Sequence, residues 1–221
     1  MHMPSDILPM YIYILCDVVA ALALSTAIVM VDRSMLKKPH ILLQTGIVLL
    51  LICGLSAMHV GTKPGMTLHW LGVMMTVMMF GPWLAILLLS TVHIIFAFGF
   101  KIGGVEAIGF NITVCVLIPA LVAAACHIFA YSRLPKNFPV YILQVGFGDL
   151  LCMLSVDVTL SMVLHSFFKY PSFVIWQDFT LLLALMGGME AVISTWVVSL
   201  LVSFLPDWLV TFNDEEYLHG K

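Results

Sequence analysis

Seven long apolar segments, joined by short polar loops, take up most of this chain. They cover residues 9–31, 41–59, 67–80, 82–100, 108–131, 138–166 and 173–205. A transmembrane helix needs about 20 consecutive apolar residues, and most of these segments are that long. Hydrophobic residues make up 62% of the sequence and charged residues only 10%, unlike a soluble domain. The segments lack the alternation of barrel strands. We therefore predict an all-α, polytopic membrane helix bundle with about seven transmembrane segments.

The third segment, 67–80, is too short to cross a bilayer comfortably. Gly81 and Pro82 separate it from the fourth segment, because proline disfavours the helical conformation of the residue before it. We expect a short helix that enters from one face within a protein-lined cavity. His69 lies at the expected start of this helix, just after a loop, 61–65, whose glycine and proline content predicts a tight turn.

Lysine and arginine residues in the loops predict the orientation, because cytoplasmic loops carry more of them. With the N-terminus outside, the inner loops hold Arg33, Lys37, Lys38, Arg133 and Lys136, and the outer loops hold Lys63, Lys101 and Lys169. We predict a multi-pass protein of the inner (plasma) membrane with its N-terminus outside. Residues 1–221 then form a single integral membrane domain, and its short acidic tail, about 206–221, is cytoplasmic.

Met1 and His2 form a candidate metal site. The terminal amine, the His2 amide nitrogen and the His2 ring can close a five-membered and a six-membered ring around one ion. Such a planar set of nitrogens suits Ni²⁺ or Cu²⁺. The first ten residues contain no lysine or arginine, so they lack the positive region of a signal peptide, and we expect them to be retained.

Several motifs recur in the order typical of one family. The chain starts MHMP (1–4), continues with MTLHWLG (66–72) and GPW (81–83), and later has GGVEAIGFN (103–111) and MGGMEAVIS (186–194). Together these motifs make about two thirds of the chain resemble the CbiM/NikM family. That family comprises the substrate-capturing membrane components of energy-coupling-factor transporters for cobalt and nickel.

The resemblance implies a ligand set for a divalent metal. It assigns the ligands to the Met1 amine, the amide and ring nitrogens of His2, and the ring of His69. Thr67 and Asn111 would orient these ligands. From its position two residues before the loop, His59 is a further candidate neighbour. The transported ion would be nickel or cobalt ahead of copper, with no other cofactor.

The chain also departs from the family pattern. Ser5 follows Pro4 where the family has an acidic residue, Thr67 replaces a serine, and Val114 replaces a second asparagine. The stretch 139–172 does not match well. The ligand set and the architecture therefore carry over better than the identity of the metal or the coupling surface.

Acidic residues inside apolar segments need an explanation, because each costs about 2.5–3.5 kcal/mol at mid-depth. They are Asp17, Asp149, Asp157, Asp178 and Glu190. Asp149 and Asp157 are eight residues apart and share a helix face. Either they line a path for a cation or proton, or they form hydrogen bonds between helices. For Glu190, the adjacent Gly187 and Gly188 favour a helix-packing contact. We interpret His93 and His127 as packing or interfacial residues.

Two functions of different classes fit the sequence. The first is a metal-uptake component that works with a transmembrane coupling subunit, cytoplasmic ATPases and a small accessory membrane subunit. The chain has no P-loop motif of its own, so ATP would be hydrolysed by partners. The alternative is a stand-alone proton-coupled metal carrier, or a metal-sensing membrane protein, that uses the buried acids. No catalytic constellation and no nucleic-acid motif is present, so we expect neither an enzyme nor a nucleic-acid partner.

Overall fold

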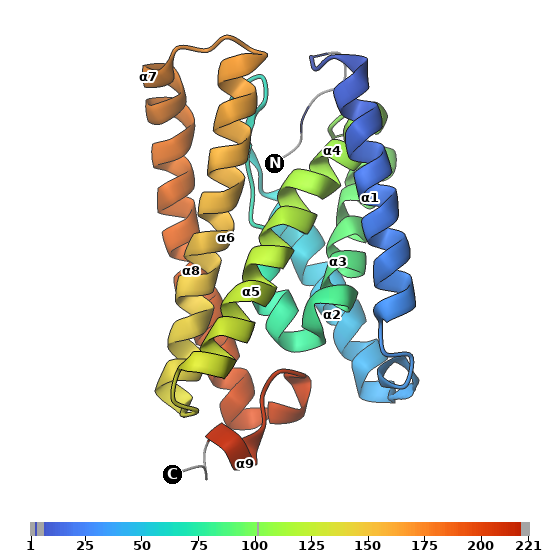
Figure 1. Cartoon of the computed structure of the whole chain (residues 1–221), viewed down its shortest axis with the longest axis vertical. Helices are drawn as coiled ribbons and strands as arrows, with labels where there is room; N and C mark the ends of the chain where they lie inside the picture. The colour runs from blue at the N-terminus through green and yellow to red at the C-terminus, as the bar shows by residue number, and fades with distance from the viewer. Residues whose placement is uncertain (1–2, 4–6, 101, 218–221) are drawn as a thin grey trace.

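The computed structural model describes residues 3, 7–100 and 102–217, which form a bundle of long helices (Figure 1). The long helices are α1 (Met10–Met30), α2 (Pro39–Ala57), α3 (Val73–Gly99), α5 (Ile118–Arg133), α6 (Phe138–Ser166) and α8 (Leu181–Phe204). The shorter helical elements are η1 (Met35–Lys37), η2 (Val105–Ala107), α4 (Ile108–Ile112), η3 (Thr113–Leu117), α7 (Ser172–Ile175), η4 (Trp176–Thr180), η5 (Pro206–Trp208) and α9 (Asp214–Tyr217). One antiparallel hairpin pairs β1 (Val60–Lys63) with β2 (Met66–Leu68).

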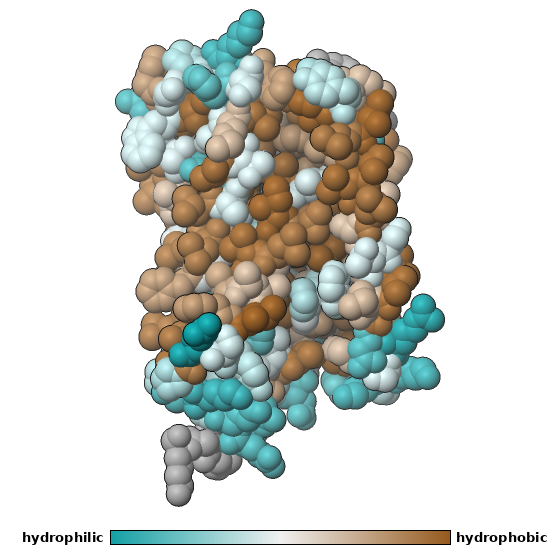
Figure 2. Space-filling view, in the orientation of Figure 1, coloured by the Kyte–Doolittle hydropathy of each residue, from teal (hydrophilic) through white to brown (hydrophobic). Residues whose placement is uncertain are grey.

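Within the described residues, six helical stretches are long and apolar enough to cross a membrane. Figure 2 shows the apolar surface around the middle of the molecule and polar side chains gathered toward its ends. These observations confirm the predicted all-α, polytopic bundle. The stretches number six because α3 is counted as one stretch, although Gly81 divides it between the predicted third and fourth segments.

Gly81 divides α3 into two parts that run in opposite directions. Its backbone has φ 75° and ψ 166°, which is not helical. The first part ends near the C-terminal segment, where the Thr211 hydroxyl donates to the Met78 carbonyl at 2.8 Å. The second part ends at the opposite side, where the Gly104 N–H donates to the Met3 carbonyl at 3.4 Å. The hairpin and the first part of α3 thus make one passage through the bundle. Helix α1 begins at one end of the bundle, and α9 lies at the other end (Figure 1).

The predicted short helix starts later than expected. Residues 66–68 form strand β2, and the helix begins at Val73, after Gly72 with a φ of 64°. The prediction that His69 lies at a helix start is therefore wrong, because His69 lies in the connection between β2 and α3. The predicted tight turn in 61–65 is confirmed as the turn of the β1–β2 hairpin.

Helix α3 forms the centre of the bundle. In its most apolar window 78% of the residues are buried, against 17% for α1. Met74 and Met78 on its first part are fully buried, as expected if these methionines fill the core. In the described part of the chain after α8, Tyr217 packs on Tyr141 with ring centroids 4.9 Å apart.

A proline also shapes the α4–α5 passage. Pro119 has no N–H to donate to the carbonyl of Cys115, four residues earlier. The five residues Thr113–Leu117 form a π-helical turn at this point, and such turns are frequent at functional sites. This turn brings Cys115 and Val116 to the lining of a small cavity beside His69.

Candidate metal centre

His69 lies in an extended segment between the hairpin and α3, and only 2% of its surface is exposed. Its Nδ1 lies 2.8 Å from the Trp70 carbonyl oxygen. A carbonyl oxygen only accepts hydrogen bonds, so the neutral ring carries its proton on Nδ1. Nε2 then carries the lone pair that a metal ion requires.

Glu190 on α8 holds the segment that carries His69. Its carboxylate accepts the Leu71 N–H at 3.1 Å and the Gly72 N–H at 2.5 Å, and its side chain is buried. The left-handed φ of Gly72 turns the chain into α3, a conformation that favours glycine. A buried acid on one helix thereby fixes the backbone that directly follows the histidine.

A cavity of about 10 Å³ lies beside His69. Its lining includes the side chains of His69 and His93, whose ring centroids are 5.9 Å apart. Ser56, Trp70 and Cys115 complete the more polar part of the wall. This volume is about the least that can hold one water molecule. The space therefore suits one small ion and is too small for an organic substrate.

The N-terminal segment is anchored next to this cavity. Met3 is buried, and its backbone N–H donates to the Asn111 side-chain oxygen at 2.8 Å. Asn111 lies four residues before Cys115, so the two are about one turn apart on the α4–η3 passage. Asn111 thus fixes the chain one residue after His2. Met1 and His2 themselves lie outside the described residues.

Comparison with known proteins identifies the family. A family model described as the cobalt uptake substrate-specific transmembrane region, CbiM, matches residues 2–208. The chain belongs to the CbiM family. A search of curated proteins gave no match.

Solved structures support the fold of this CbiM family member. The chain is similar to a crystal structure of a truncated transition metal transporter, with 22% identity and a TM-score of 0.74. That match covers 92% of this chain and 99% of the other. A second transition metal transporter gives 21% identity and a TM-score of 0.72, covering 100% of this chain and 96% of the other. At this level of identity the similarity shows the fold alone.

Two other residues singled out in the sequence lie around the His69 segment. Thr67 is half-buried in strand β2, opposite Gly61 of β1. His59 is exposed, with its Nδ1 3.1 Å from the Ala57 carbonyl oxygen, and it does not line the cavity. Across residues 3, 7–100 and 102–217, no three His, Cys, Asp or Glu side chains form a cluster that could hold a metal.

For four of the five acids in apolar segments, the partners lie at well-defined positions. Asp17 accepts the Gly109 N–H at 3.2 Å, and Asp178 pairs with Lys63 at the hairpin. Glu190 holds the His69 segment, as described above. Asp157 accepts hydrogen bonds from two hydroxyl groups, those of Ser161 and Thr180.

Asp149 differs from the other four acids. It is buried on α6, and one of its oxygens, Oδ2, has no hydrogen-bond partner in the described part of the chain. Asp157, in contrast, is half-buried and lines cavities on the outside of α6. The two cavities that Asp157 lines do not include Asp149, so the geometry favours hydrogen bonding between helices over a path through this pair.

Sequence reasoning missed two residues near His69. The sequence predicts packing roles for His93 and Glu190, but it does not predict that His93 lies beside the His69 ring or that Glu190 binds the segment after His69. The sequence offers one signal for each: a histidine and an acid within apolar helices are both costly unless they have partners. Only the fold identifies those partners, because His93 and Glu190 are 24 and 121 residues from His69 in the sequence.

Proposed function

We propose that this chain is the membrane component that captures a divalent transition metal, nickel or cobalt, for uptake. The observation that carries the proposal is the buried His69 beside a cavity of about 10 Å³. Membership of a family described as a cobalt uptake substrate-specific transmembrane region supports the same conclusion. The metal ion is the cargo of this protein rather than a resident cofactor.

The proposed ligands are four nitrogen atoms: the Met1 amine, the His2 amide, the His2 ring and Nε2 of His69. The hydrogen bond from Met3 to Asn111 supports this set, because it fixes the residue to which His2 is joined. Four nitrogens in a plane suit Ni²⁺ well. Within this scheme His93 packs against the His69 ring and limits its rotation.

The proposed orientation places the start of α1 and the hairpin outside the cell, in the inner (plasma) membrane. The loops at the opposite end, 31–38 and 134–137, carry Arg33, Lys37, Lys38 and Lys136. This enrichment supports a cytoplasmic location for that end. A reporter fused after Lys221 is then expected to read as cytoplasmic. An external reading would contradict capture from outside.

Energy for transport would come from partners. The sequence contains no P-loop motif, so we propose a transmembrane coupling subunit and cytoplasmic ATPases, with a small accessory membrane subunit as a further partner. A stand-alone proton-coupled carrier would need titratable groups along one path. We favour the capture component because Asp157 lines lateral cavities, whereas Asp149 and Glu190 lie within the bundle.

The binding stoichiometry tests the proposal. Untagged protein with its native N-terminus is titrated with Ni²⁺, Co²⁺ and Zn²⁺, and the bound metal is measured per chain. One Ni²⁺ or Co²⁺ per chain, bound more tightly than Zn²⁺, is the expected result. Preference for Zn²⁺, or several weak sites per chain, would contradict the proposal.

A further inference from the structure

A groove runs along the outer side of the seam between α6 and the α7–α8 passage. It consists of three adjoining cavities of about 510, 230 and 450 Å³. The first two share Leu150, and the last two share Asp157 and Thr180. Because neighbouring cavities share lining residues, they follow one another along the same seam, and we call the row of three the groove.

The groove is as long as the bilayer is thick. On α6 its lining extends from Leu143 to His165, which is about 33 Å at 1.5 Å per residue. The hydrocarbon core of a bilayer is about 30 Å thick. A lipid chain occupies one leaflet only, so the length of the groove fits one transmembrane helix better than a lipid.

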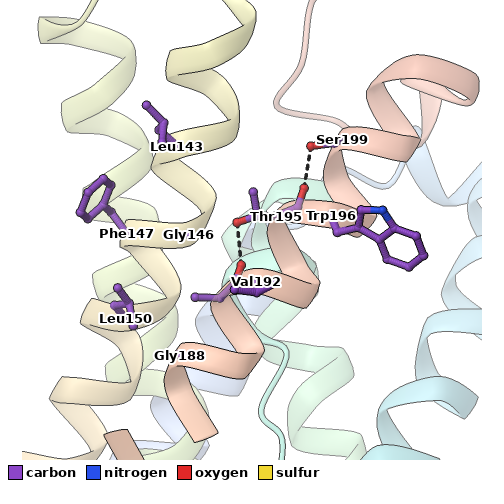
Figure 3. Close-up of a pocket in the computed structure, with 10 residues that line it drawn as sticks. Leu143, Gly146, Phe147, Leu150, Gly188, Val192, Thr195, Trp196 and Ser199 are labelled. Atoms are coloured by element: carbon purple, nitrogen blue, oxygen red, sulfur yellow. Dashed lines mark hydrogen bonds between the residues drawn. The ribbon is translucent and has the colours of Figure 1, made fainter. Parts of the chain in front are cut away.

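The half of the groove nearer the C-terminus combines small residues with large apolar ones such as Leu143 and Leu150. Figure 3 shows Gly146 of α6 facing a row on α8 that includes Gly188, Thr195 and Ser199. A Cβ built on Gly188 would meet nothing within 4 Å. Gly146 serves the contact between α6 and α8, because a Cβ there would meet Thr195 Oγ1 at 3.0 Å. The small residues of α8 that have open space, above all Gly188, let a second helix approach closely within a membrane. The exposed Phe147 and Trp196 belong to the same lining, 65% and 64% accessible.

The other half of the groove contains a carboxylate. Both the Ser161 hydroxyl and the Thr180 hydroxyl donate to Oδ1 of Asp157, at 3.3 Å and 3.0 Å. The ion pairs found among the described residues are Lys63–Asp178 and Lys136–Glu216, so no cation of that part of the chain pairs with Asp157. An acid facing lipid at this depth is costly, and a basic side chain from another helix would offset that cost.

We propose that this groove is the docking site for one transmembrane helix of a partner protein, whose basic side chain pairs with Asp157. The small residues around Gly188 set the close approach of the two helices. Asp157, about 12 Å from the outer end of the groove by helix rise, sets their register. This inference does not depend on the metal ligands, because the groove and the His69 cavity share no lining residue.

Synthetic transmembrane helices test the proposal. The full-length protein carries a donor dye at its C-terminus and is reconstituted in phosphatidylcholine vesicles with an acceptor-labelled Leu/Ala helix of about 22 residues. One helix carries a Lys at the depth of Asp157, and the matched helix carries Leu there. We expect energy transfer to report roughly threefold to tenfold tighter association of the Lys helix, in line with the measured strength of interhelical hydrogen bonds.

Three variants separate the possible occupants. Asp157→Asn can still accept from Ser161 and Thr180, and it should remove the preference for Lys. Gly188→Leu fills the groove and should weaken binding of both helices. Gly46→Leu is the matched control, because Gly46 is an exposed helical glycine of α2 with equal space around it, and it should change nothing. Thermal unfolding of each variant checks that the fold is retained.

Three results would overturn the proposal. Equal association of the two helices with the wild-type protein would remove the role of Asp157. Equal losses in Gly188→Leu and Gly46→Leu would show that the groove is not the contact surface and remains lined by lipid. Energy transfer between two copies of the protein that Gly188→Leu abolishes would identify a second copy as the occupant.

Discussion

Helix α8 carries polar side chains on two faces. Those on the inner face form hydrogen bonds with another segment, and those on the outer face form them within the helix. On the inner face, Glu190 accepts two N–H groups from the segment that follows His69. On the outer face, the hydroxyls of Thr195 and Ser199 donate to carbonyls of their own helix at 2.6 Å and 2.7 Å (Figure 3). The inner face therefore builds the candidate metal centre. On the outer face the hydroxyl donors are bonded within the helix, so this face can contact lipid when no partner helix is bound.

Replacing Glu190 should have the largest effect on stability. Glu190→Ala leaves the buried Leu71 N–H and the partly buried Gly72 N–H without an acceptor. The cost is about 1–3 kcal/mol for each N–H, so we predict a loss of about 2–6 kcal/mol of unfolding free energy. Thr195→Val on the outer face should cost under about 1 kcal/mol, because the helix backbone is unchanged. Unfolding in detergent measures both variants. Equal losses would remove the distinction between the two faces.

His69→Ala should have the next largest effect, on metal affinity. Loss of a group that merely orients a ligand costs roughly 10–100-fold in affinity, and loss of a ligand should cost at least that. His93→Ala should cost less, because we assign it the positioning of the His69 ring. His127→Ala, outside the cavity lining, and Gly188→Leu, in the groove, should leave Ni²⁺ affinity unchanged. A loss in His127→Ala equal to that in His69→Ala would contradict the assignment.

Asn111→Ala tests the anchoring of the N-terminal segment. The variant removes the acceptor for the Met3 N–H, a contribution of about 1 kcal/mol, so we predict roughly fivefold to tenfold weaker Ni²⁺ binding. Thr113→Val is the matched control on the same passage, because its hydroxyl donates to the Cys16 carbonyl instead. Isothermal titration compares the two variants. Unchanged affinity in Asn111→Ala would mean that the anchor does not position the ligands.

The smallest effect concerns the end of the molecule remote from the His69 cavity. The hydrogen bond from Lys136 lowers the pKa of Glu216, and the hydrogen bonds to Glu216 and Tyr131 raise the pKa of Lys136 to about 12. A lowered carboxyl pKa stabilises the folded protein at pH values above the ordinary carboxyl pKa of about 4.3. This stabilisation is lost as the pH falls through the lowered pKa. The lysine contribution is lost as pH rises through about 12.

Because this pair is exposed to solvent, its effect should be small and should weaken further in salt. Hydrogen exchange of α9 measured across acid pH should show a modest loss of protection at the lower end. In Glu216→Gln that pH dependence should disappear. Metal affinity should follow neither change, since neither residue of the pair lines the His69 cavity and α9, which carries Glu216, lies at the opposite end of the bundle from the start of α1 (Figure 1).

The sequence predicts most of the fold because membrane helices depend on length and apolar composition. The Gly81–Pro82 break is also readable, since both residues act through the local backbone. The start of α3 cannot be predicted from the local sequence. Strand β2 depends on pairing with β1, and the turn at Gly72 depends on the hydrogen bond to Glu190. A local pattern therefore predicts a helix at 67, whereas tertiary hydrogen bonds start it at Val73.

The candidate site was predictable only in part. His69 and Asn111 stand in motifs that resemble a known family, so they could be singled out in advance. The partners of Glu190 and the position of His93 depend on how distant helices pack, which no local spacing encodes. The placement of Asp157 on a lateral groove also depends on packing. Helix periodicity predicts the position of Asp157 relative to Asp149, but it does not predict which residues line an outer groove.

The most direct test of the account is the metal affinity of the native N-terminus compared with an N-terminus extended by one alanine. The extension converts the Met1 amine into an amide and displaces the two chelate rings. If the Met1 amine and His2 are ligands together with His69, Ni²⁺ or Co²⁺ affinity should fall at least 100-fold, while the thermal unfolding of the metal-free protein stays the same. Equal affinity of the two proteins would contradict the proposed ligand set.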